Sequence, residues 1–288
     1  KKAEISIHAH LMESTFKSLS DPQFKIEIIN ELIKIDLLTL IPLIEEYIDK
    51  NIDNSEILRG IPQLLIMIGS KDVKSLIHKL VLSASGDLLI EISNAISDSK
   101  EDYSTFIDQD IIIKRSREIA GIIFQNIAFT YKDTFIAKDA FINDYFKYKE
   151  SEEVESLLRL ACILLSDEPI DSYVHSIKNK DNQVPFIIEV IEHKLPKLIS
   201  SVLVPIIEIE SSTEKFDMGS KFYKLNTELE KQCIELYSSN DDWLQAITSY
   251  LIVNEGNEDH NPDDIIWEKL TTNNIAADII DTRRIKQT

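Results

Sequence analysis

The 288-residue sequence has few of the residues that build turns and cross-links, with 6 Gly, 8 Pro and 2 Cys. So little Gly and Pro excludes the many tight turns of a multistranded β protein. Cys162 and Cys233 lie far apart among apolar residues, a spacing that suits neither a disulfide framework nor a zinc site. We interpret both cysteines as small core residues in a reducing compartment.

Basic residues are also scarce, because 31 Lys and Arg stand against 50 Asp and Glu, giving a formal net charge of −19. Nucleic-acid binding depends on Lys and Arg that neutralise phosphates, and the sequence contains no sustained basic stripe. The same deficit counts against direct binding to anionic lipid. We therefore expect no nucleic-acid partner. The acidic excess favours solubility, and the alternative is that it steers a basic partner.

Long hydrophobic runs are absent as well. The longest, Ile119–Phe129 and Val202–Ile209, fall far short of the roughly 20 residues that a membrane span requires. No signal-peptide pattern opens the sequence, which starts at Lys1 without Met and so suggests a piece of a longer protein. We expect these residues to act in water, in the cytoplasm, without inserting into a membrane.

Helical periodicity, by contrast, recurs almost throughout, and 43% of the residues are hydrophobic, which is ample for a core. The sequence therefore predicts an all-α fold. Apolar spacing predicts helices near 12–19, 22–32, 41–48, 57–68, 73–80, 88–96, 108–129, 154–165, 170–177, 184–192, 198–209, 222–237, 241–251 and 265–270. We expect one helical domain over 1–252, followed by a polar linker, a short helix and a loose tail over 253–288.

Part of the sequence repeats itself. Ser20–Glu46 and Lys180–Glu210 both run from a polar stretch with Asp into an apolar helix, a short turn and a helix with a central Pro, at Pro42 and Pro205. A hairpin of two helices buries its apolar side only by stacking on neighbours, which builds a superhelix. We predict a HEAT-like α-α superhelix whose middle section, 98–149, is irregular with longer helices. The alternative is an irregular helical bundle.

Residues 151–210 resemble the HEAT-like domain attached to bacterial membrane proteins similar to ATP/ADP translocases and related major-facilitator-type transporters. The resemblance is carried by hydrophobic patterns and one acidic-Pro turn, at Leu157–Leu165, Asp167–Pro169, Ile170–Ile177, Ile187–Ile191 and Leu203–Ile207. It implies a cytoplasmic, non-catalytic accessory domain on a transporter-like protein. It carries over no catalytic, cofactor-binding or metal-binding residue.

Motifs for catalysis are hard to find. The six glycines never cluster, so a phosphate-binding loop or a dinucleotide fingerprint is not expected. His8 and His10 face different sides of any helix, and we interpret the isolated His78, His175 and His193 as surface or satisfied residues. Glu152, Glu153 and Glu155 are interpreted as a group of charges in a helical first turn. We predict no catalytic residue, no cofactor and no metal, hence no enzyme.

Aromatic residues gather between Phe135 and Tyr148, and three of them give the candidate docking patch. Phe141, Tyr145 and Tyr148 lie at near-helical spacing and could present an anchor to a protein partner. Core packing explains the same spacing equally well.

The leading hypothesis is a non-enzymatic, armadillo-like protein-binding domain that couples a bacterial membrane transporter to cytoplasmic regulation. Its partner is an unidentified protein, and a membrane-embedded region of the same full-length chain is one candidate. The alternative is a free-standing cytosolic HEAT-repeat scaffold. A repeat-fold enzyme such as a DNA glycosylase fits less well, because it needs a cationic groove.

Overall fold

The fold is described from a computed structural model that covers the whole chain. The structure describes residues 37–52, 54–69, 73–99, 101–131, 140–165, 168–227, 236 and 244–246, without the side chains of 37–40, 43 and 140–142. Its described helices are α3 (Leu37–Asn51), α4 (Ser55–Leu58), α5 (Ile61–Ile68), α6 (Lys74–Ser83), α7 (Gly86–Ser97), the 3-10 helix η2 (Tyr103–Thr105), α8 (Gln109–Phe129), α10 (Ala140–Cys162), α11 (Ile170–Asn179), α12 (Val184–Lys194), α13 (Lys197–Glu208) and α14 (Ser212–Gly219). These residues form helices and no strand, which confirms the all-α prediction for this part of the chain.

The chain divides into two compact units. Unit 1 consists of 1–122 and 151–209, and unit 2 of 123–150 and 210–288. The long helices α8 and α10, of 21 and 23 residues, contribute to both units. The predicted boundary after residue 252, and all of 253–288, lie outside the described residues.

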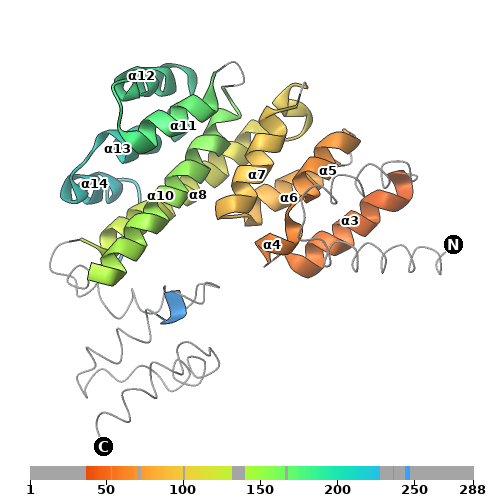
Figure 1. The fold of residues 1–288 in the computed structure, drawn as a ribbon, viewed down its shortest axis with the longest axis horizontal. Coiled ribbons are helices and arrows are strands. Elements are labelled where there is room, and N and C mark those ends of the chain that lie inside the picture. The colour runs from red at the N-terminus through yellow and green to blue at the C-terminus, as the bar shows by residue number, and fades with distance from the viewer. Residues whose placement is uncertain are drawn as a thin grey trace, which may run out of the picture. The chain divides into compact units, whose positions relative to one another are not determined.

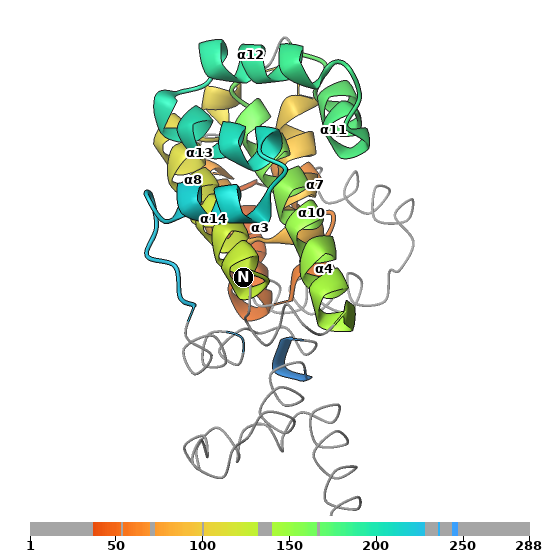
Figure 2. The same ribbon diagram turned by 90° about the vertical axis from the view of Figure 1, so that its left-hand side faces the viewer.

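Unit 1 is a succession of short helices packed through aliphatic side chains. Figure 1 shows α5, α6 and α7 side by side, and each of the three contacts the other two. Figures 1 and 2 show α11, α12 and α13 following one another in the same way, with α12 packed on both of its neighbours. The fully buried side chains of unit 1 include Leu64, Leu65, Leu80, Leu89, Leu157, Ile187, Ile191 and Leu203.

Polar contacts add cross-links between the helices of unit 1. Lys79 of α6 pairs with Asp49 of α3, and the carbonyl of Ala84 accepts a bond of 2.7 Å from the buried Arg115 guanidinium of α8. Such an end-capping bond satisfies a carbonyl that α6 leaves unpaired at its C-terminus.

Unit 2 is built differently, around aromatic side chains. Phe129, Phe146 and Leu236 form a buried cluster, with the Phe129 and Phe146 rings 5.3 Å apart. Tyr131 stacks on Phe216 of α14 at 4.1 Å.

One predicted helix, at 57–68, is two helices in the structure. Gly60, with a φ of 87°, stands in the left-handed region between α4 and α5, a conformation that glycine adopts at little cost. Pro62 then fits the first turn of α5, where no N–H bond is lost. Gly69, with a φ of 61°, ends α5 where the sequence predicts a stop.

Two predicted boundaries are wrong. The helix expected to start after Ser151 begins at Ala140, so Glu152, Glu153 and Glu155 lie inside α10 and not in its first turn. Residues 222–227, expected to be helical, form a turn and irregular chain after the unpredicted α14. Glu and Lys are good helix formers, and they let α10 continue through a sequence that looks like a helix start.

Pro42 and Pro205, the two prolines of the predicted repeat, each lie inside a helix, α3 and α13 respectively. The helix expected before Pro42, at 22–32, lies outside the described residues. Among the helices that the structure describes, none combines the length and the apolar composition of a membrane span.

Candidate functional site

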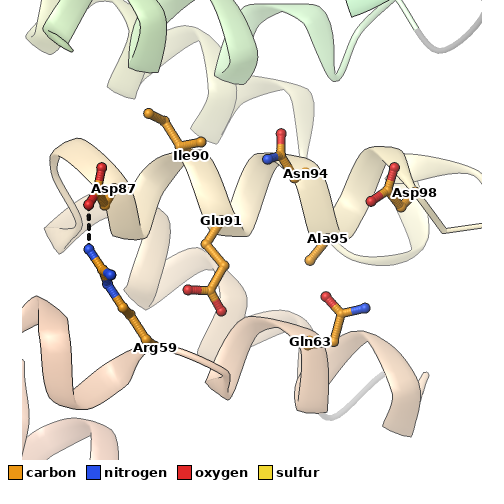
Figure 3. A pocket seen from close by; sticks show the side chains of 8 residues that line it. All are labelled: Arg59, Gln63, Asp87, Ile90, Glu91, Asn94, Ala95 and Asp98. Carbon is orange, nitrogen blue, oxygen red and sulfur yellow. Dashed lines mark hydrogen bonds and ion pairs between the residues drawn. The ribbon is translucent and has the colours of Figure 1, made fainter. Parts of the chain in front are cut away.

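A polar groove of about 280 Å³ lies in unit 1 where the start of α5 meets the outer side of α7. Figure 3 shows α7 running from Asp87 to Asp98 above Arg59 and Gln63 of the α4–α5 segment. The groove is lined by Arg59, Gln63, Asp87, Ile90, Glu91, Asn94, Ala95 and Asp98. Three carboxylates against one guanidinium make this lining acidic.

The polar residues of α7 share one stripe of the helix. Asp87, Glu91, Asn94 and Asp98 are spaced by four, three and four residues, which brings them to one side of the helix. Between them, the apolar Ile90 and Ala95 complete the lining. A stripe of this kind can contact a ligand along the length of α7.

One end of the groove is closed by structural bonds. Arg59 forms an ion pair with Asp87, as the dashed line in Figure 3 marks. The carboxylate of Glu91 accepts the backbone N–H of Gly60 at 2.6 Å, at the N-terminus of α5. A carboxylate is stabilised at this position by an unpaired N–H group and by the helix dipole. These contacts hold α5 against α7.

Asn94 is fixed from outside the groove. Its Oδ1 accepts a bond of 2.9 Å from Nη1 of Arg159, which also donates to Asp171 at 2.8 Å and to Glu155 at 3.0 Å through Nε. Because Arg159 takes the oxygen, the orientation of the Asn94 amide is set and its two N–H groups remain as donors. Lys178 binds Glu155 from α11.

The charges of this Arg159 network support one another. Burial alone would raise the pKa of Glu155, but hydrogen bonds from Lys178 and Arg159 outweigh it and lower that pKa below its ordinary value. Burial alone would lower the pKa of Arg159, yet its bonds to Asp171 and Glu155 raise it. Both groups therefore stay charged at neutral pH, and α7, α10 and α11 are joined behind the groove.

The other end of the groove carries polar groups that no described residue engages. They are the exposed amide of Gln63, the N–H groups of Asn94 and the exposed carboxylate of Asp98. Asp98 stands at the C-terminus of α7, whose last turn holds no basic residue. The helix dipole makes such an end electronegative, so both the helix and the carboxylate favour a cation there.

The ionisable groups of the lining are three carboxylates and one guanidinium. Neither a Ser, Cys or Lys nucleophile nor a His base is among the lining residues. Within the described ranges, no group of three or more His, Cys, Asp and Glu side chains could hold a metal ion. Cys162 lies fully buried in α10, and burial raises the pKa of its thiol to about 12, which keeps it protonated and unreactive.

The predicted docking patch lies on α10. Tyr145 is half-buried and packs against the cluster of Phe129, Phe146 and Leu236 in unit 2. Tyr148 is 59% exposed, and Phe141 is on the same helix with its side chain outside the description. Tyr145 is thus engaged in the core, and a docking role for the three residues stays a prediction.

The groove itself was missed in the sequence. The polar residues of α7 have the spacing of the solvent-exposed side of an amphipathic helix, and such a pattern alone does not predict a binding site. Phe135, at the start of the aromatic segment, and the histidines His8 and His10 lie outside the described residues. His78 accepts the backbone N–H of Asp108 at 3.1 Å, as expected of a satisfied histidine.

Comparisons with protein-family models, with curated proteins and with solved structures find no match for this chain.

Proposed function

We propose that this chain is a non-enzymatic, HEAT-like protein-interaction domain, and that its groove between α5 and α7 is where a partner binds. The observation that supports this proposal is the difference between the two ends of the groove. One ion pair and a helix cap anchor one end, while Gln63, Asn94 and Asp98 leave hydrogen-bonding groups unengaged by described residues at the other.

The superhelical architecture is part of the same proposal. Gly60 and Arg59 at the start of α5 meet Glu91 and Asp87 in the first half of α7, so the two helices begin at the same end of the groove. Helix α6 connects them and packs on both. Helices α5 and α7 therefore run in the same direction, and α6 runs back between them. Successive helical hairpins of a repeat protein stack with this alternation of direction, and their continuous surface serves binding.

We further propose that the domain is the cytoplasmic appendage of a bacterial transporter-like membrane protein. The support is the resemblance over residues 151–210, whose four helical patterns overlap α10, α11, α12 and α13. The partner of the groove is then a protein segment, from the same full-length chain or from a regulator.

Site-specific photo-cross-linking in the native cell tests the interaction function. Gln63 is replaced by p-benzoylphenylalanine in the natural full-length protein, and Glu192, exposed on α12, is replaced in a matched control. A protein adduct of defined mass at position 63 and its absence at position 192 are the expected result. Equal adducts at both positions, or none at position 63, would contradict the proposal.

Membrane attachment is tested separately by fractionation. After an alkaline carbonate wash, the full-length protein of the native cell is expected to remain in the membrane pellet. Its complete release into the supernatant would contradict the transporter attachment and favour the free-standing scaffold.

A further inference from the structure

We draw no further inference here: the strongest candidate, the exposed apolar surface that Phe186 and Leu198 give to the α12–α13 hairpin, carries nothing because no contact in the described part of the chain shows what covers it.

Discussion

The interactions that stabilise unit 1 internally differ from those that stabilise unit 2. In unit 1, short helices share layers of Leu and Ile, and ion pairs such as Lys79–Asp49 and the Arg159 network link helices from the outside. In unit 2, rings pack on rings: Phe129 contacts Phe146, Tyr131 contacts Phe216, and Phe124 lies 5.8 Å from Tyr223.

This difference predicts which kinds of substitution each unit tolerates. Aliphatic layers are adaptable, so unit 1 can carry a polar groove on its surface provided that charged residues fix the helices around it. Unit 2 instead depends on close approaches over long sequence separations. Gln125 of α8, for example, donates to the carbonyl of Asn226 and accepts its N–H, both at 3.0 Å. Unit 2 is therefore expected to be more sensitive to steric change and unit 1 to loss of volume or charge.

The largest effect is expected from Leu203→Ala, in the aliphatic core of unit 1. Leu203 is fully buried, and its truncation should lower the free energy of unfolding by about 2–5 kcal/mol through lost burial and a cavity. Urea denaturation followed by circular dichroism measures the loss. Leu198→Ala, at a side chain 52% exposed on the same helix, is the control, and an equal loss there would contradict the assigned packing.

Arg159→Met should come next, because one guanidinium serves three helices. Its loss leaves Asn94, Asp171 and Glu155 without a shared donor, at a cost of about 1.5–3 kcal/mol for hydrogen bonds to charged groups. Lys178→Met removes only the exposed half of the network and should cost less than 1 kcal/mol, about that of a surface ion pair. Equal costs in the two variants would show that the network does not depend on Arg159.

Gly219→Ala tests the sensitivity of unit 2 to steric change. A Cβ at Gly219 would lie only 2.4 Å from Cδ1 of Phe124, so we expect a loss of about 1–3 kcal/mol from overpacking. Phe124→Ala removes the two nearest atoms, Cδ1 and Cγ, and leaves only Cβ at 2.9 Å, so in the double variant the two losses should be less than additive. Strict additivity in thermal unfolding would exclude this contact as the cause.

The smallest effect is a dependence on pH in unit 1. Burial lowers the pKa of His78 below 6.5, and Lys74 also lowers it while Asp108 opposes the shift. The unfolded chain therefore binds the proton more readily, so stability should fall as the pH drops below 6.5. His78→Gln can still accept the Asp108 N–H and should flatten this part of the stability–pH curve. A curve unchanged by the substitution would assign the dependence to other groups.

Much of the helical organisation could be predicted, because apolar spacing reports burial directly. The stripes at 41–48, 73–80, 88–96 and 108–129 each fall in a described helix, α3, α6, α7 and α8. Gly60 escaped notice because an isolated glycine in an apolar stripe is also tolerated within a helix. The start of α10 was missed because Ser151 with three nearby Glu residues has the composition of a first turn.

The groove could not be predicted from sequence for a different reason. Asp87, Glu91, Asn94 and Asp98 have helical spacing, but so does the wet side of any surface helix. Their meaning depends on α5 lying alongside and on Arg159, 65 residues after Asn94, fixing an amide. Both features depend on the tertiary structure, which the spacing of residues along α7 does not report. The superhelix and the docking role of Phe141, Tyr145 and Tyr148 stay predictions.

Cross-linking from several positions tests the central claim most directly, because it reports whether a protein partner lies at the groove. p-Benzoylphenylalanine is placed at position 63, at position 98 or, as the control, at position 192 of the natural full-length protein. The account predicts a protein adduct of the same mass from positions 63 and 98 and none from position 192. Adducts from position 192, or from Phe186 and Leu198 of the α12–α13 hairpin and not from the groove, would contradict it.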